Sequence, residues 1–318
     1  MPYLIGIDEA GYGPNLGPLV ITATVWRVES AADQTDLYDL LSGVITSAPN
    51  DRSGRLAIAD SKALYKPRGP LGALERGVLA AAAVLDHRPD DWPQLCDALD
   101  PECRDQCDEL PWQTDFHLSL PREMDREQLE GLTSKLQAGL SQSDVTLRAI
   151  HSTLVFPARF NRLVQDHGNK STVLSTLSLR LLARALEGLD EPVLVICDKH
   201  GGRNRYGPLL QTQFPEPLIE VRDESRACSI YRWGPPEQRV ETRFAVGGES
   251  FLPAALASMT CKYLRELSMR ALNDFWVGHL PQLRPTAGYP VDARRFKDQI
   301  AAMQGKLGID DRLLWRCR

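Results

Sequence analysis

Residues 4–20 of this 318-residue chain read LIGIDEAGYGPNLGPLV. Two adjacent carboxylates, Asp8 and Glu9, stand between short apolar runs and are followed by a Gly-x-Gly turn. Apolar runs bounded by Gly and Pro are typical of buried strands, so the stretch predicts a hairpin with acid at its tip. An acid at the end of a buried strand is costly unless a positive group meets it. We therefore expect a cation, most simply a metal ion, beside Asp8 and Glu9.

Two other interpretations of this stretch are a dinucleotide-binding loop and a purely structural turn. A Gly-x-Gly turn also occurs in dinucleotide-binding loops, but Pro14 and a following strand do not suit the start of a phosphate-binding helix. A structural turn beside a solvated acid pair remains open on this stretch alone.

Length and composition narrow the class of protein. The chain is long enough for one large or two modest domains, and no apolar run approaches the ~20 residues that span a bilayer. The start of the sequence has no basic region before the acid pair, so we expect no signal peptide. Seven cysteines without a framework pattern indicate reduced thiols, and we expect a cytoplasmic protein without a membrane partner.

The net charge of −5 is unevenly distributed. Residues 86–130 hold 14 acidic and 4 basic side chains, so the rest of the chain is net positive. From residue 260 onward, 11 basic side chains stand against 6 acidic ones, which suits a face that approaches phosphate. A solvated surface is the alternative for any such count.

A second apolar run ends in acid at PVLVICD, residues 192–198. We expect Asp198 to join Asp8 and Glu9. A Gly-containing basic loop follows, from Lys199 through Arg203, in which His200 is either a metal ligand or proton carrier, or a loop histidine near substrate.

A fourth acid precedes a long amphipathic pattern, FLPAALASMTCKYLRELSMRALNDFW, residues 251–276. Glu249 and Glu266 compete for a place beside the other acids. They lie 17 residues apart, roughly 25 Å along a helix, so only one can join a metal pair whose ions are about 4 Å apart. Glu266 can instead pair with Arg270 one helical turn away.

Asp60-Ser61-Lys62 is a further short motif. Lys62 is a compact positive charge suited to a point contact with phosphate. A helix N-cap at Asp60 or Ser61 with a surface lysine is the alternative.

The stretch Asp8-Glu9-Ala10-Gly11-Tyr12-Gly13-Pro14, followed by Gly17-Pro18, resembles the signature of the type 2 ribonucleases H, that is, ribonucleases HII and HIII. Asp-Ser-Lys, the acid-tipped strand and the acid-then-helix element are similar to later parts of the same family. The resemblance covers residues 1–28, 59–86, 145–200 and 246–300. Two positions depart from it, because the family usually has Arg or Lys in place of Tyr12 and Asp-Gly in place of Asp198-Lys199.

The resemblance implies a ribonuclease H-like α/β fold, with a mixed central sheet flanked by helices and an inserted acidic segment. It also implies a metal-dependent endonuclease that cleaves the RNA strand of RNA/DNA hybrids and leaves 5′-phosphate and 3′-hydroxyl ends. Glu249 is preferred over Glu266 because the family's acid stands just before the helix. The four implied ligands of two Mg²⁺ or Mn²⁺ ions are Asp8, Glu9, Asp198 and Glu249.

The implied contacts with nucleic acid share a place in the resembled motifs or in the basic loop after Asp198. They are Gly11, Tyr12, Gly13, Ser61, Lys62, Lys199, Arg203 and Tyr289. Core packing is the alternative for Tyr289. Two other functions stay open: a diverged nuclease for another structured nucleic acid, or a nucleic-acid-binding protein without catalysis. No protein partner is inferred.

We expect one catalytic domain over residues 1–318, with a basic helical segment at 285–318. Residues 87–124 are rich in Pro, Asp and Cys and predict an irregular insertion. A zinc site there, from Cys96, Cys103, Cys107 and His117, would lack the usual paired C-x₂-C spacing. The remaining expected elements are helices at 70–86, 126–140 and 171–189, strands at 19–28 and 145–155, a helix then a loop at 30–56, and antiparallel strands within 209–246.

Overall fold

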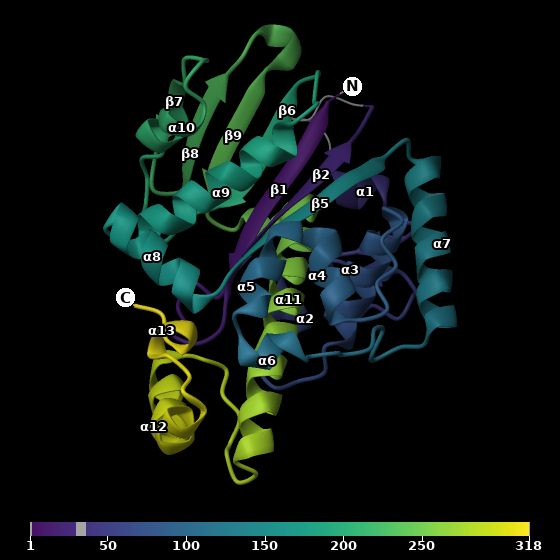
Figure 1. Cartoon of the computed structure of the whole chain (residues 1–318). Helices are drawn as coiled ribbons and strands as arrows, with labels where there is room; N and C mark the ends of the chain where they lie inside the picture. The colour runs from purple at the N-terminus through teal and green to yellow at the C-terminus, as the bar shows by residue number, and fades with distance from the viewer. Residues whose placement is uncertain (1, 30–35, 318) are drawn as a thin grey trace.

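A mixed β-sheet crosses the molecule in the computed structural model, which describes residues 2–29 and 36–317 (Figure 1). Over these residues the sheet has seven strands in the order β5-β2-β1-β6-β9-β8-β7. The strands are β1 (Tyr3–Ala10), β2 (Leu19–Arg27), β5 (Thr146–Val155), β6 (Val193–Asp198), β7 (Glu220–Glu224), β8 (Cys228–Trp233) and β9 (Val240–Ala245), with β3 (Ile45–Thr46) and β4 (Leu56–Ala57) pairing apart from them.

Helices lie on both sides of the sheet (Figure 1). The longer ones are α3 (Gly72–Val84), α7 (Arg126–Gln142), α8 (Pro157–His167), α9 (Lys170–Leu186), α11 (Leu252–His279) and α12 (Pro290–Leu307). The shorter ones are α1 (Leu37–Leu40), α2 (Ser61–Leu64), α4 (Trp92–Leu99), α5 (Arg104–Asp108), α6 (Pro111–Thr114), α10 (Gly207–Gln213) and α13 (Asp311–Leu314), with 3₁₀ turns η2 (Pro101–Cys103), η3 (Pro236–Gln238) and η4 (Gly248–Ser250). The α/β class predicted from the sequence, a mixed sheet flanked by helices, is confirmed.

Strand direction decides where the acidic strand ends meet. β1, β6 and β9 are neighbours and run parallel. On the other side of β1, β2 pairs antiparallel with β1, and β5 pairs antiparallel with β2. Because parallel strands end at the same edge of a sheet, the carboxyl ends of β1, β6 and β9 lie together. The sequence motifs that follow these strands therefore share one edge.

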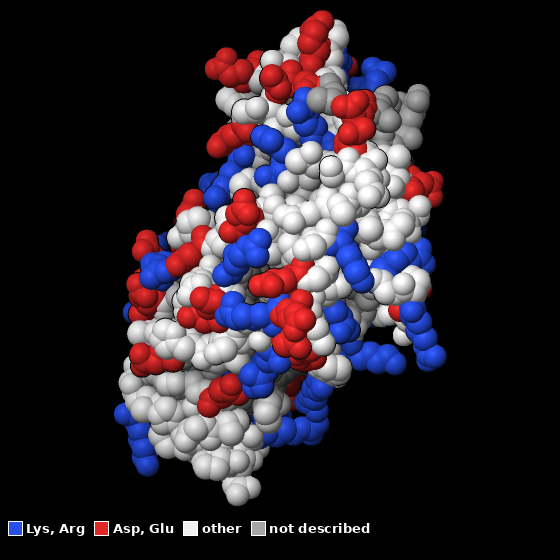
Figure 2. Space-filling view, turned by 90° about the vertical axis from the view of Figure 1, so that its right-hand side faces the viewer, with Lys and Arg blue, Asp and Glu red and all other residues white. Residues whose placement is uncertain are grey.

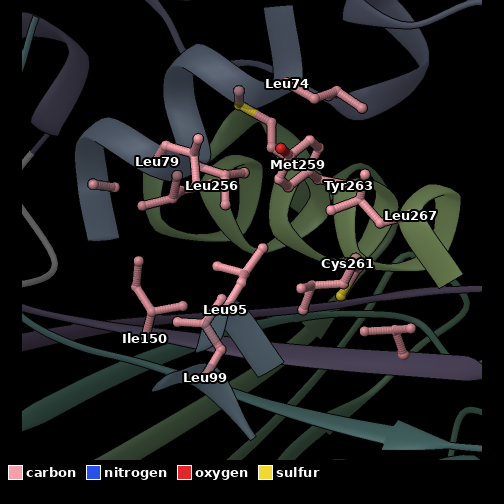
Figure 3. Packing of buried hydrophobic residues seen from close by; sticks show 14 of the residues in the cluster. Leu74, Leu79, Leu95, Leu99, Ile150, Leu256, Met259, Cys261, Tyr263 and Leu267 are labelled. Atoms are coloured by element: carbon pink, nitrogen blue, oxygen red, sulfur yellow. The ribbon is translucent and has the colours of Figure 1, made fainter. Parts of the chain in front are cut away.

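Alternating side chains of β1 divide the interior into two layers. Leu4 packs into a core with α3 and α11, while Ile5 and Ile7 pack into a second core with α9 on the opposite face. This alternation follows from the two-residue period of a strand. Figure 3 shows the first layer, in which Leu74 and Leu79 of α3 meet Leu256, Met259 and Tyr263 of α11.

Helix α11 approaches the sheet closely at Gly6. A Cβ at Gly6 would collide with the backbone of Pro253 and Ala254. The Thr24 hydroxyl also donates to the carbonyl of Pro253, at 2.7 Å. The first turn of α11 therefore packs directly on β1 and β2. The contact on β1 is at Gly6, two residues before Asp8 in the chain.

Two segments differ from the sequence prediction. Residues 87–124 were expected to be irregular, but they form α4, η2, α5 and α6, and Trp92, Leu99 and Trp112 belong to the main core. The apolar residues of α4, Trp92, Leu95 and Leu99, are spaced by three and four, a signal that the prolines of the segment obscured. Within 209–246, β7 pairs antiparallel with β8 and β8 with β9, as expected, and β9 in addition pairs in parallel with β6. Part of the helix expected at 30–56 lies outside the described residues; α1 follows it.

Charge on the outer surface is mixed where α7 faces the viewer (Figure 2). Acidic and basic side chains alternate there and form no continuous basic field. Over the described residues, no helix has the length and apolar character to cross a membrane.

Candidate active site

The first acids of the candidate site lie at the ends of two paired strands. β1 and β6 are in register at Ile7 and Cys197, and the next residue of each is Asp8 and Asp198. Burial and the negative charge of Asp198 raise the pKa of Asp8 to about 7, although Ser258 and the amide of Glu9 hydrogen-bond to it. The structure therefore brings together Asp8 and Asp198, which stand 190 positions apart in the chain.

Glu9 belongs to the same cluster. Its pKa is raised well above the usual range, first by burial and then by the charges of Asp8 and Asp198. The positive charge of Lys62 acts in the opposite direction on Glu9. Crowded carboxylates of this kind favour binding of a cation, which would relieve their mutual repulsion.

Asp60 is a further acid of this cluster. The sequence predicts it only as part of a short motif or as a helix N-cap. Its side chain caps α2, and its charge contributes to the raised pKa of Asp8. Ser258 of α11 connects the two, because its hydroxyl lies 3.3 Å from the Asp60 carboxylate and hydrogen-bonds to Asp8. Only the packing of α2 against α11 places Asp60 there, and no local pattern would have revealed it.

Glu249 lies in η4, directly after β9, and its side chain is outside the described residues. The neighbouring Gly248 packs against the end of β6, since a Cβ at Gly248 would lie 3.6 Å from the amide nitrogen of Asp198. The backbone of η4 is therefore beside Asp198.

Glu266, the competitor of Glu249, is engaged elsewhere. Its carboxylate accepts from Lys262 at 2.6 Å and from the Tyr65 hydroxyl at 3.0 Å. The expected pair between Glu266 and Arg270 is wrong, because Arg270 pairs with Asp274.

The donor chemistry and charge of Asp8, Glu9 and Asp198 fit hard divalent cations, which prefer oxygen ligands. Among the described side chains, however, no three of the His, Cys, Asp and Glu type form a group arranged to hold a metal ion. The described acids thus form an electrostatic site for a cation without a complete ligand set.

The Gly11–Gly13 turn leaves the acid cluster in a left-handed conformation at Gly11, whose φ is +90°. A Cβ at Gly11 would press on the Pro18 carbonyl and the Arg265 side chain, whereas a Cβ at Gly13 would meet nothing within 4 Å. One side of the turn is therefore packed and the other is open to a ligand. The ring of Tyr12, between these glycines, contacts Lys170 of α9.

No family model and no curated protein matches the chain. The chain is similar to solved ribonucleases HII and HIII. One is the structure of an Archaeoglobus fulgidus complex of PCNA and ribonuclease HII, at 13% identity and a TM-score of 0.42, with 99% of this chain and 94% of that chain covered.

Two further structures to which the chain is similar are a Pyrococcus horikoshii ribonuclease H2 and a Bst ribonuclease HIII with Mn²⁺. The first has 14% identity and a TM-score of 0.46 and covers 98% of this chain and 92% of that chain. The second has 15% identity and a TM-score of 0.43 and covers 99% of this chain and 65% of that chain. These are proteins of the family that the sequence motifs resemble.

Of the residues expected to contact nucleic acid, Lys62 and Tyr289 are exposed. The Lys62 ammonium lies 4.0 Å from the Asp60 carboxylate, and Tyr289 is 53% exposed, which excludes core packing as its role. Tyr289 begins α12 and follows Gly288, whose carbonyl accepts from the amides of Asn15 and Leu16. Tyr289 therefore lies beside the loop that follows the Gly11–Gly13 turn.

Ser61 and Lys199 have other partners. Ser61 is buried, and its hydroxyl lies 3.1 Å from that of Ser258, so it joins α2 to α11. Lys199 is buried too, and its ammonium donates to Asn204 at 2.8 Å and to the carbonyl of Ser225 at 2.6 Å. Both support the site from within, and neither presents its polar group to a ligand.

His200 is a core histidine. Burial lowers its pKa to about 3, its ring contacts Ser175 and Cys197, and it packs against Tyr206 and Phe244. A metal-binding or proton-transferring role is therefore excluded by its surroundings.

The cysteines of residues 87–124 share a cluster, but the zinc alternative is not supported. Cys96 and Cys103 are buried, whereas His117 is exposed. None of the described Cys and His side chains forms a metal group. Hydrogen bonds from Cys103 and Cys96 lower the pKa of Cys107 to about 4.

Proposed function

We propose that this chain is a metal-dependent endoribonuclease that cleaves the RNA strand of RNA/DNA hybrids. The observation that carries the proposal is the gathering of Asp8, Glu9 and Asp198 at one edge of the sheet. There Asp198 raises the pKa of Asp8, and Asp8 and Asp198 both raise the pKa of Glu9. The motif around Asp8, which resembles that of the type 2 ribonucleases H, supports the substrate class.

In this proposal the acids hold two Mg²⁺ or Mn²⁺ ions, with the Glu249 carboxylate as a fourth ligand. When bound, such a pair supplies an activated water and stabilises the leaving 3′-oxygen of an in-line displacement, which leaves a 5′-phosphate. Ser258 and Asp60 orient Asp8 by hydrogen bonding and charge. Asp8 must be ionised to bind a cation, so its raised pKa should weaken cation binding as the pH falls below about 7.

The open side of the Gly11–Gly13 turn is where the chain would meet the sugar of the substrate. Selecting RNA over DNA requires a contact with the 2′-hydroxyl. Backbone groups at Gly13 are accessible because a Cβ there would meet nothing within 4 Å. Lys62, which is exposed at the start of α2, supplies a positive charge for phosphate beside Glu9.

The test is hydrolysis of a labelled RNA/DNA hybrid and of a DNA duplex with one embedded ribonucleotide, each with Mg²⁺ or Mn²⁺. We expect cleavage of the RNA strand, and a loss of about 100-fold or more in Asp8→Asn and Asp198→Asn, because each change removes a metal-binding charge. Asp274→Asn, a change at an exposed acid far along α11, is the matched control and should cleave normally.

Hybrid binding without cleavage by the unmodified chain would favour the non-catalytic nucleic-acid-binding protein. Cleavage that persists in both Asp8→Asn and Asp198→Asn would contradict the proposed site.

A further inference from the structure

Two positively charged side chains, Lys170 and Arg203, gather around Tyr12 in the turn that follows Asp8 and Glu9. The ammonium of Lys170 lies 4.6 Å from the centroid of the Tyr12 ring. The guanidinium of Arg203 lies 3.4 Å from the Ser171 hydroxyl and 3.3 Å from the Thr172 hydroxyl. A cation over an aromatic face is held there by the negative charge of the ring face, so Tyr12 positions Lys170.

The Tyr12 hydroxyl closes this cluster. It hydrogen-bonds to Ser171, and the positive charge of Arg203 acts on its pKa. We call Tyr12, Lys170, Ser171, Thr172 and Arg203 the cationic cluster. Its members come from the turn after β1, the start of α9 and the loop after β6, so the same strand ends that bring the acids together also assemble it.

The cluster has an excess of positive charge. The first turn of α9 contains no acidic residue, and a cation is unfavourable at the positive end of a helix dipole. In the described part of the chain, no ion pair joins Lys170 or Arg203 to a carboxylate. The Nε of Arg203 is buried without a hydrogen-bond partner. An anion from outside the chain would neutralise the charges of Lys170 and Arg203.

The position of the cluster specifies the anion. Tyr12 follows Glu9 by three residues, and the charge of Glu9 acts on the pKa of Tyr12, so the cations around Tyr12 lie near the acids. A strand held at the acids by the phosphate to be cleaved therefore continues past Lys170 and Arg203. Both side chains are only half-buried, as a contact with a polymer requires.

We propose that Lys170 and Arg203 bind a backbone phosphate of the nucleic-acid strand next to the phosphate that is cleaved, with Tyr12 holding Lys170 in place. This inference rests on the proposed function for the identity of the ligand. Arg203 was already expected to contact nucleic acid, whereas Lys170 had no assigned role. Tyr12 carries no charge of its own, and Lys170 supplies the positive charge at this side of the turn.

The experiment measures binding separately from cleavage. Fluorescence anisotropy of a labelled RNA/DNA hybrid is recorded with the full chain at several salt concentrations, with EDTA present so that no cleavage occurs. Lys170→Ala and Arg203→Ala should each weaken binding several-fold and make the slope of log K against log salt shallower by about one, because each removes one phosphate contact. Lys170→Arg, which keeps the charge, should bind like the unmodified chain.

Arg180→Ala is the matched control, because Arg180 is an exposed cation on the same helix, about 15 Å from Lys170 along the axis. Its slope should not change. Tyr12→Ala should weaken binding as Lys170→Ala does, whereas Tyr12→Phe, which keeps the ring, should lose less. Lys170→Gln provides a second neutral variant if Lys170→Ala does not fold.

The outcomes separate this inference from the proposed function. A chain that binds the hybrid with the expected change in slope but does not cleave it with Mg²⁺ or Mn²⁺ would support the phosphate contact and contradict the nuclease. A chain that cleaves, with slopes and affinities unchanged in Lys170→Ala and Arg203→Ala, would overturn the phosphate contact alone. Absence of binding by the unmodified chain would overturn it as well.

Discussion

Asp8 is the residue on which most of the proposed chemistry depends. It lies two residues before the end of β1, its backbone carbonyl accepts from the Cys261 thiol of α11 at 3.1 Å, and its side chain hydrogen-bonds to Ser258. Its local sequence places an acid at a strand end. The neighbours that raise its pKa, Asp198 and Asp60, come from other parts of the chain.

The raised pKa of Asp8 predicts a pH dependence of stability. The folded chain holds the Asp8 proton up to about pH 7, whereas an unfolded chain releases it near pH 4. The folded state therefore binds more protons in this window, and the free energy of unfolding should fall as pH rises from about 4 to above 7. The fall is of the order of 2–4 kcal/mol for this one group.

Urea unfolding in EDTA at pH 5, 6, 7 and 8 measures this effect. Asp8→Asn, which has no proton to lose, should lose less stability across the same range, and Mg²⁺ or Mn²⁺ should restore part of the loss in the unmodified chain at pH 8. Parallel pH profiles of stability for the two proteins would show that the pKa of Asp8 is not raised by folding. Glu9, Asp60 and Asp198 lie beside it, so the comparison is made between the two proteins rather than read from one curve.

At the scale of elements, the contact of β1 with α11 positions the acids relative to Ser258. This contact needs a residue without a side chain at position 6, because the backbone of Pro253 and Ala254 occupies the space of a Cβ. Gly6 stands in the middle of a strand, where its flexibility alone is destabilising. Its presence there is explained by the close approach of the helix.

Gly6→Ala should destabilise the chain by about 1–3 kcal/mol or more, because an inserted methyl must displace the helix backbone. Thermal unfolding of the two proteins provides the measurement. The cleavage rate per folded molecule should also fall, because Asp8 moves relative to Ser258.

Gly131→Ala is the control for the opposite sign. Gly131 lies within α7, and a Cβ there would meet nothing within 4 Å. Alanine should stabilise the helix by up to about 1 kcal/mol. A Gly6→Ala variant as stable as the unmodified chain would mean that α11 can withdraw from β1 without cost.

At the scale of the whole molecule, the segment around Arg316 is packed beneath the turn at the other end of the sequence. Arg316 is 1% exposed, and its guanidinium donates to the carbonyls of Gly11, at 2.5 Å, and Pro14. Its backbone also exchanges hydrogen bonds with Asn15. Burial and the neighbouring charge of Arg265 lower the pKa of Arg316 to about 9.

Arg316→Met should loosen the turn without unfolding the chain. The loss of hydrogen bonds from a charged donor corresponds to about 1.5–3 kcal/mol of local stability. Removal of a buried like charge beside Arg265 offsets part of this in global unfolding. Hydrogen exchange measured by mass spectrometry should therefore be faster in a peptide covering residues 9–18 and unchanged in one covering β6.

Arg312→Met is the control, because Arg312 is largely exposed and pairs with Asp310. It should leave exchange in residues 9–18 unchanged. Equal exchange in Arg316→Met and the unmodified chain would mean that the turn keeps its conformation without the guanidinium.

Local patterns allowed several elements to be predicted. The apolar runs before Asp8 and Asp198 predicted β1 and β6. The proline-rich residues 92–114 were not recognised as helical, because each helix there is one or two turns long and its stability comes from burying Trp92 and Trp112.

By itself, the sequence determined that acids stand at strand ends and that a glycine turn follows the first pair. These are properties of neighbouring residues, and they depend on strand period and turn chemistry. Only the tertiary structure decided that Asp60 joins Asp8, that Lys170 covers Tyr12 and that Arg316 holds Gly11. These contacts join residues 52, 158 and 305 positions apart, so they exist only once the parallel strands and the packed helices bring the chain together.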